Sequence, residues 1–339
     1  MEWQTRVTDL LGSKYPIMEG GLSGIGTWDL AAAISETGAV GCITAGLYKT
    51  PDKLQEAIRK TKEATKNPFS VNISIGMVRH IDEMLEVCFA EKVPHIETAV
   101  YKPDAYAERL KKAGIPWIHK GATLDFCKHA ETLGADAVVL VGLDGYGFKH
   151  VRQLPTFTAI AHASKQLKVP LIAAGGIGDG QTFLGALALG AEGVYMGTAF
   201  EVTQECRLSQ RMKENIVEAI PDHPGLIYEL LAPPDMKDYM DVKAAKDEMP
   251  FEKWIPAMEA VHLKHKHWKD IRPMWEMAEG LLEGQDHDVK FLGDKIKGPY
   301  SFACAYIDEI PTCQELVERI VREAEEILDG WTFLKSKLG

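Results

Sequence analysis

Two short glycine-bearing segments are the residues whose types and spacing point most directly to chemistry. The first, AAGGIGDG, contains Gly175 and Gly176, and the second is Met196-Gly197-Thr198. Because glycine has no Cβ, the backbone can approach a phosphate closely and present its N–H groups to the oxygens, and Thr198 adds a hydroxyl donor. The pattern predicts a phosphate-binding site, although glycines that only form tight turns would look the same.

Three further segments follow or contain apolar runs and could contact a ligand. Gly21 and Leu22, in PIMEGGLS, would bring backbone close to a flat ring or a phosphate. Asn72 stands inside FSVNI, where its amide could serve the edge of a heteroaromatic ring or cap the end of a strand. Lys120, in IHKG, could hold a bound anion, form a Schiff base with a carbonyl substrate, or be a solvated lysine at a rim.

The segment VGLDGYGFKH is the candidate for acid–base chemistry. It contains Gly145, Tyr146 and His150 directly after an apolar run. A histidine titrates near neutral pH and commonly serves as a general base or acid, and a phenol can donate to an oxyanion. A glycine-rich surface loop is the competing interpretation.

The elements that must position these residues alternate regularly. Up to about residue 218, apolar runs alternate with amphipathic helical windows, which favours a parallel sheet with helical crossovers. The eight runs cover residues 15–18, 40–44, 69–75, 95–100, 117–119, 137–141, 170–174 and 193–196. Eight such units predict an α/β fold of the (β/α)8 TIM-barrel type, in which the loops after the last two strands are neighbours at the phosphate-binding face. An open doubly wound sheet has the same alternation, but no glycine segment completes the dinucleotide fingerprint G-x-G-x-x-G.

The chain divides into three predicted regions. Residues 1–220 form the barrel, and residues 221–300 form a helical insertion or lid after the eighth strand, with helical windows near 256–269 and 273–283. Residues 301–339 contain QELVERIVREAEEIL, an amphipathic helix that we expect to pack back on the barrel.

Composition limits the cellular setting and the partners. The 339 residues include 38 Lys plus Arg and 49 Asp plus Glu, and the formal net charge of -11 disfavours nucleic-acid binding. No apolar run reaches the roughly 18 residues of a membrane span, and the first residues do not resemble a secretory signal.

Six scattered cysteines without a C-x-x-C pair predict reduced thiols in a cytoplasmic protein, with Cys42 as a small core residue. The histidines of HLKHKH have no carboxylate or cysteine placed to complete a metal site, so none is expected. The predicted partner is a small-molecule substrate, and a homodimer is compatible with the sequence.

Several motifs together resemble one family. PIMEGG, FSVNI, GADAVVLVG, VPLIAAGGIGDG and ALALGAEGVYMGTAF resemble the nitronate monooxygenase (2-nitropropane dioxygenase) family, whose close relatives are the flavin-dependent enoyl-acyl-carrier-protein reductases. The resemblance implies a TIM barrel that holds FMN at its carboxyl-terminal face. It implies that the phosphate of FMN binds to Gly175, Gly176, Gly197 and Thr198. The predicted cofactor-binding set is completed by Gly21, Leu22, Asn72, Lys120, Gly145 and Met196.

The loop after the sixth run departs from the family pattern. The family typically has an acid-Ala-Gly-Gly-His sequence there, whereas Phe148 stands at the position of the histidine and His150 follows two residues later. Either His150 or Tyr146 is therefore the predicted catalytic residue, or the family's base is absent.

The leading hypothesis is an FMN-dependent oxidoreductase, similar to nitronate monooxygenase, that oxidises a small carbon acid such as an alkyl nitronate. An NAD(P)H-dependent enoyl-thioester or quinone reductase on the same scaffold is the alternative. A barrel of another class, an aldolase acting through Lys120 or an isomerase, would bind a phosphorylated metabolite without redox chemistry.

Overall fold

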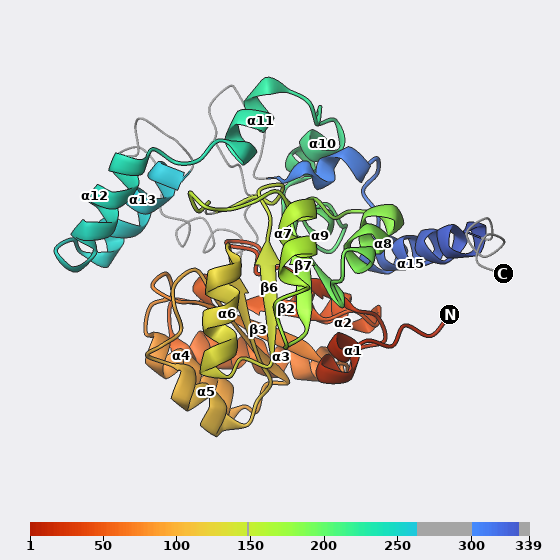
Figure 1. Cartoon of the computed structure of the whole chain (residues 1–339). Coiled ribbons are helices and arrows are strands. Elements are labelled where there is room, and N and C mark those ends of the chain that lie inside the picture. Colours follow the sequence, from red (N-terminus) through yellow and green to blue (C-terminus); the bar gives the residue numbers. More distant parts are fainter. Residues whose placement is uncertain (148, 263–299, 332–339) are drawn as a thin grey trace.

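Eight parallel strands form a barrel at the centre of the computed structural model, which describes residues 1–147, 149–262 and 300–331 (Figure 1). The strands are β1 (Ile17–Glu19), β2 (Gly41–Thr44), β3 (Phe69–Ser74), β4 (His95–Ala99), β5 (Trp117–Gly121), β6 (Ala137–Val141), β7 (Leu171–Ala174) and β8 (Gly193–Met196). Their order is β1-β8-β7-β6-β5-β4-β3-β2, and a bridge between Met18 and Val40 joins the two end strands. The backbone N–H of Val40 donates to the carbonyl of Ile17 at 2.9 Å across this seam. The predicted (β/α)8 barrel is confirmed, and the open-sheet alternative is excluded.

Helices follow the strands and cover the outside of the barrel. They are α2 (Trp28–Glu36), α3 (Pro51–Ala64), α4 (Ile81–Ala90), α5 (Ala107–Ala113), α6 (Leu124–Leu133), α7 (Thr156–Ala163) and α8 (Gly180–Ala188), with the short 3-10 helix η1 (Ala45–Leu47) after β2. Local sequence explains several starts. The side chain of Thr50 accepts from Lys53 N ahead of Pro51, and Asp179 forms a capping box with Thr182. The helices bury their apolar faces against the outward-facing apolar side chains of the strands.

Helix α1 (Arg6–Leu11) closes the amino-terminal end of the barrel. Val7 and Leu11 are buried, and they cluster with side chains of the barrel interior such as Met18, Ile118 and Val139. Because these apolar side chains fill this end, the carboxyl ends of the strands form the face that is left for a ligand.

A helical segment follows β8. It comprises α9 (Thr198–Glu201), α10 (Gln210–Val217), α11 (Pro224–Leu231), α12 (Met236–Ala244), η2 (Ala245–Asp247) and α13 (Phe251–His262). Trp254 of α13 packs in one apolar cluster with Met77 and Tyr101, which lie in the loops after β3 and β4. Arg79, in the same β3 loop, pairs with Glu252 at 2.9 Å. The segment that contains α12 and α13, which we call the cap, therefore contacts the carboxyl-terminal face of the barrel at the loops after β3 and β4, and Figure 1 shows it to the upper left of the strands.

The helices of the insertion differ from the sequence prediction. The helices at Pro224–Leu231 and Met236–Ala244 were not expected, because turn-forming prolines and charged residues obscure their apolar period. The window predicted near 256–269 begins earlier, at Phe251, and its part beyond residue 262 lies outside the described residues. The window predicted at 273–283 lies wholly outside them.

The carboxyl-terminal region returns to the barrel through η5 (Phe302–Tyr306) and α15 (Cys313–Gly330). Thr312 and Glu315 form a capping box that begins α15, and the helix packs against α8 and α2. Its outer end meets the amino terminus, where Trp3 Nε1 donates to Glu325 at 3.2 Å. Of the helices in the described ranges, none combines the length and the apolarity that crossing a bilayer requires.

Candidate active site

The glycine loops after β6 and β7 meet at the carboxyl-terminal face. Gly175 and Gly176 adopt φ of +104° and +73°, which favour glycine, and a Cβ on Gly175 would lie 2.9 Å from the backbone N of Gly145. A Cβ on Gly176 would lie 3.0 Å from the Cβ of Asp144. The two loops thus leave no room for larger residues, and the tight-turn interpretation accounts for part of the glycine pattern.

The loop after β8 lies beside the loop after β1. A Cβ on Gly197 would meet only Leu22 Cδ2, at 3.3 Å, and Gly20 N–H donates to Met196 O at 2.7 Å. Thr198 is buried, and its hydroxyl oxygen accepts from Ser301 N at 3.0 Å, so the hydroxyl hydrogen is left to donate elsewhere. Within the described ranges, the backbone N–H groups of Gly197 and Thr198 have no hydrogen-bond acceptor.

The residues present therefore fit a phosphate-bearing cofactor. The loops after β6 and β7 meet through glycine, the loop after β8 lies beside the loop after β1, and a buried hydroxyl and backbone N–H groups are available as donors. Among the residues that the structure describes, no carboxylate accepts a hydrogen bond from these donor groups.

A buried polar layer lies directly beneath the β1 loop, inside the barrel. Glu97 on β4 is fully buried, and its Oε1 accepts from Asn72 Nδ2 at 2.7 Å and from Tyr195 OH at 2.6 Å. The phenol oxygen of Tyr195 in turn accepts from Gly21 N at 2.5 Å and from Lys120 Nζ at 3.2 Å. A Cβ on Gly21 would lie 2.6 Å from Asn72 Nδ2. The structure thus brings the predicted residues Gly21, Asn72 and Lys120 together.

The sequence reasoning missed Glu97 and Tyr195, which form the centre of this layer. The available signal was a carboxylate inside the apolar run HIETA, because an acid is rarely buried without partners. Burial raises the pKa of Glu97, whereas Lys120, Tyr195 and Asn72 favour its ionised form. Burial also raises the pKa of Tyr195, so its hydroxyl keeps its proton at neutral pH.

A second missed acid, Glu19, lies at the seam between β1 and β2. Its Oε2 accepts from Cys42 N at 2.6 Å. This backbone N–H lies beyond the single bridge between Met18 and Val40, so it bonds to the carboxylate instead of to the neighbouring strand. Burial raises the pKa of Glu19 well above its usual range. Cys42 is buried as expected, but its thiol also lies 3.8 Å from Glu97 Oε2.

The loop between β6 and α7 is held by its own polar groups. Asp144 Oδ2 accepts from Thr156 N at 2.6 Å at the start of α7, and the carbonyl of Asp144 accepts from Phe302 N at 3.1 Å. Lys149 is buried and donates to the carbonyls of Leu143, at 2.6 Å, and Gly145. Tyr146 is half-buried in this loop, and Phe148 lies outside the described residues.

His150 lies at the end of the same loop, against α6 rather than within the buried polar layer. Its ring contacts Phe126 edge-on, with centroids 5.1 Å apart, and Nδ1 accepts from Arg152 N at 3.2 Å. In the neutral ring the proton therefore sits on Nε2. Desolvation, with Arg152 and Lys243 of the cap, lowers the pKa of His150, so the ring is neutral at pH 7.

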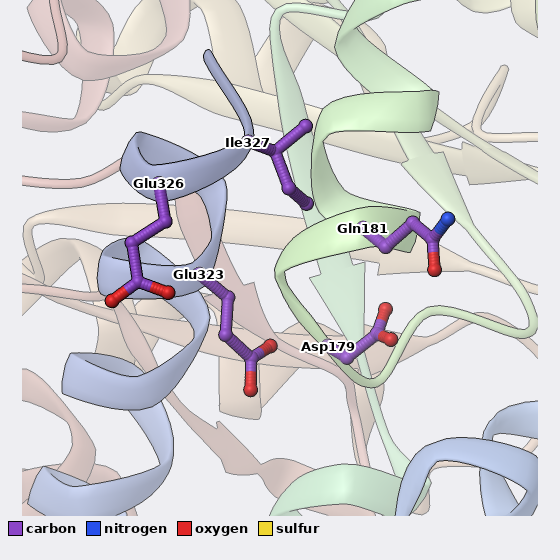
Figure 2. Close-up of a pocket in the computed structure, with 5 residues that line it drawn as sticks. All are labelled: Asp179, Gln181, Glu323, Glu326 and Ile327. Carbon is purple, nitrogen blue, oxygen red and sulfur yellow. The ribbon is translucent and has the colours of Figure 1, made fainter. Parts of the chain in front are cut away.

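A hollow of about 390 Å³ lies elsewhere, between α8 and α15 (Figure 2). Its lining includes Asp179, Glu323 and Glu326, whose carboxylates would repel an anionic cofactor. Asp179 caps α8 through Thr182 N at 2.7 Å, and Glu323 Oε2 accepts from Gly180 N at 2.9 Å. These roles are structural, and we place the candidate active site at the glycine loops.

A closed parallel barrel, with glycine loops after its last strands and a buried polar layer beneath them, defines a cofactor-binding barrel enzyme. The family model described as "Nitronate monooxygenase" matches residues 4–93 and 77–323, so the chain belongs to this family. It is a flavin-dependent oxidoreductase.

Three relatives show how the similarity is distributed. The chain is 28% identical to "(3aS,4S,5R,7aS)-5-hydroxy-7a-methyl-1-oxo-octahydro-1H-indene-4-carboxyl-CoA dehydrogenase" of Rhodococcus jostii, over 98% of this chain and 99% of that protein. It is 29% identical to a "Probable nitronate monooxygenase" of Staphylococcus aureus, over 64% of this chain and 73% of that protein. The structure of FabK from Thermotoga maritima matches with a TM-score of 0.74 and 31% identity, over 98% of this chain and 99% of that one.

Proposed function

We propose that this chain is an FMN-dependent oxidoreductase that acts on an acyl thioester, by dehydrogenation or its reverse. One observation favours an acyl thioester over a nitronate as the substrate. The similarity to the coenzyme A thioester dehydrogenase covers 98% of the chain and so includes the cap, whereas the similarity to the nitronate monooxygenase covers 64%. Because the cap packs against the loops after β3 and β4 at the carboxyl-terminal face, it would take part in deciding which substrate enters.

The glycine loops would hold the FMN phosphate through Gly175, Gly176, Gly197 and Thr198. Gly21 and Leu22 would lie along the ring. When bound, the flavin supplies a hydride acceptor or donor. Lys120 presents a positive charge at the mouth of the barrel, and Tyr195 orients it by accepting its hydrogen bond at 3.2 Å.

Other groups of the chain would handle water and protons. Met77 and Tyr101 pack against the cap and limit the access of water to the face. His150, neutral at pH 7 with its proton on Nε2, would exchange a proton with substrate, and Tyr146 of the same loop is the other candidate.

A reductant panel tests this proposal. We expect yellow protein whose flavin absorbance bleaches anaerobically when a saturated acyl-coenzyme A is added, or bleaches with NADH or NADPH and recovers with an enoyl-coenzyme A. Bleaching by an alkyl nitronate, with no response to any thioester or nicotinamide, would contradict the thioester assignment. Protein that takes up no FMN would contradict flavin binding altogether.

Nitronate oxidation is the second candidate, and the family model that matches most of the chain favours it. The aldolase alternative has less support, because Lys120 Nζ lies 3.9 Å from Glu97 Oε1, and a lysine in an ion pair is a poor nucleophile for a Schiff base. Borohydride trapping of a carbonyl substrate on Lys120 would support the aldolase instead.

His150→Ala tests the proposed proton-transfer residue. We expect turnover to fall about 100-fold, as is common for loss of a general acid or base, while the protein keeps its flavin. If His150 acts as a base after Nδ1 releases its hydrogen bond from Arg152 N, kcat/KM of the parent enzyme should also fall as the pH drops through the lowered pKa of this ring. Turnover and flavin content are the measurements, and Tyr146→Phe is the companion variant. Unchanged turnover in His150→Ala would remove this residue from the mechanism.

A further inference from the structure

Glu97 is the acceptor on which the buried polar layer converges. The hydrogen-bond donors around it are Asn72 Nδ2, at 2.7 Å, and Tyr195 OH, at 2.6 Å, both to Oε1, and the thiol of Cys42 faces Oε2 at 3.8 Å. Ser74 Oγ donates to Asn72 Oδ1 at 2.9 Å, which fixes the amide with its nitrogen toward Glu97. Burial raises the pKa of Glu97, and these donors oppose that shift because they favour the ionised form of the carboxyl group.

The hydrogen bonds of Tyr195 run in a single direction. Its oxygen accepts from Gly21 N and from Lys120 Nζ, and neither of these groups can accept when the lysine is charged. The phenol hydroxyl therefore donates its hydrogen to Glu97 Oε1, at 2.6 Å. The chain of donors leads from Lys120, through Tyr195, to the buried carboxylate.

The carboxylate of Glu97 and the ammonium of Lys120 also stabilise each other. Glu97 is fully buried, and an ionised buried carboxylate is costly without a nearby opposite charge. Lys120 Nζ lies 3.9 Å from Glu97 Oε1 and 4.8 Å from the centroid of the Tyr195 ring. The side chain of Lys120 is 23% exposed, so it connects the buried acid with the mouth of the barrel.

We propose that Glu97 is a positioning residue that, through Tyr195, fixes Lys120 as a charged ammonium at the mouth, where it stabilises an anion bound there. The anion is the negatively charged form of the flavin ring, and this identity rests on the proposed function. Glu97 itself is sealed beneath Tyr195 and the β1 loop, so it acts through Lys120 and not by touching substrate.

The first test measures the amine of Lys120 and needs no flavin. The 339-residue chain is stripped of cofactor and labelled with trace acetic anhydride at pH 8, and the modification of Lys120 is quantified by mass spectrometry against exposed Lys112 in the same molecule. We expect Glu97→Gln, which keeps the shape but loses the charge, to speed Lys120 labelling about tenfold, because the amine is no longer held in an ion pair with the carboxylate 3.9 Å away. Tyr195→Phe keeps the carboxylate and should give a smaller increase.

The control is Glu192→Gln, whose carboxylate pairs with Arg6 outside this layer. We expect it to leave Lys120 labelling unchanged. Equal labelling of Lys120 in the parent protein and in Glu97→Gln would overturn the proposal, and this result can be read whether or not the protein binds flavin.

The second test uses the flavin-loaded protein and sulfite. Sulfite adds to oxidised flavin and leaves a negative charge on the ring, so its affinity reports a positive charge nearby. We expect Glu97→Gln to raise the sulfite Kd about tenfold, in parallel with the faster labelling. Faster labelling with unchanged sulfite affinity would overturn the assignment of the ring as the anion, whereas absence of flavin in every variant and in the parent would refute the proposed function instead.

Discussion

Gly197→Val is expected to yield folded protein without flavin. The φ of Gly197 is -103°, which any residue adopts, and a Cβ there would meet only the flexible tip of Leu22 at 3.3 Å. The fold should therefore tolerate valine. The added side chain would, however, stand where the phosphate must approach the N–H groups of Gly197 and Thr198. We expect the Kd for FMN to rise at least about 100-fold, or roughly 2.7 kcal/mol.

The measurements are the ratio of flavin to protein absorbance after purification and a titration of stripped protein with FMN. Gly185→Val is the matched control, because Gly185 lies in α8 and a Cβ there meets no atom within 4 Å. It should bind FMN as the parent does. Full flavin content in Gly197→Val would refute the assignment of the β8 loop to the phosphate.

Glu201→Gln is expected to stabilise the protein at alkaline pH. Glu201, on α9, is 8% exposed, and its Oε2 has no hydrogen-bond partner within the described ranges. Burial raises the pKa of this carboxyl to about 8 from an ordinary value of 4.5. The folded state therefore keeps a proton that the unfolded chain releases, so its stability falls as the pH rises from 4.5 through 8.

Glutamine cannot lose a proton, so the variant lacks this contribution. We expect the difference in free energy of unfolding between variant and parent to grow with pH, by roughly 3 kcal/mol from pH 4.5 to 7 and by about 5 kcal/mol above pH 8. Urea denaturation at pH 5 and pH 8.5 measures it. In the control Glu108→Gln the effect should be small and opposite, because Lys112 lowers the pKa of exposed Glu108. A difference between Glu201→Gln and the parent that is the same at both pH values would contradict the buried, unpaired state of Glu201.

The sequence was sufficient for the local features of the barrel. Alternating apolar runs and amphipathic windows predicted all eight strands, because each run must be buried on both faces. The glycine pairs were recognisable because positive φ and close backbone approach exclude other residues, as Gly175 and Gly176 show. Some helix boundaries differ from the predicted ones because a capping residue sets where the helix begins. An example is α15, which begins directly after its cap Thr312.

Only the tertiary structure decided which polar side chains meet. Glu97, Lys120 and Tyr195 lie on β4, β5 and β8, and they share one layer because the closed sheet aligns Glu97 with Ile118 and turns the inward residues of all eight strands toward one axis. No local pattern in the sequence records this register or the closure. By itself, the sequence determined the barrel and the family, and it predicted the glycine loops as the phosphate site. The buried carboxylate, the direction of its hydrogen bonds and the position of His150 outside that layer follow from long-range packing, which local periodicity does not specify.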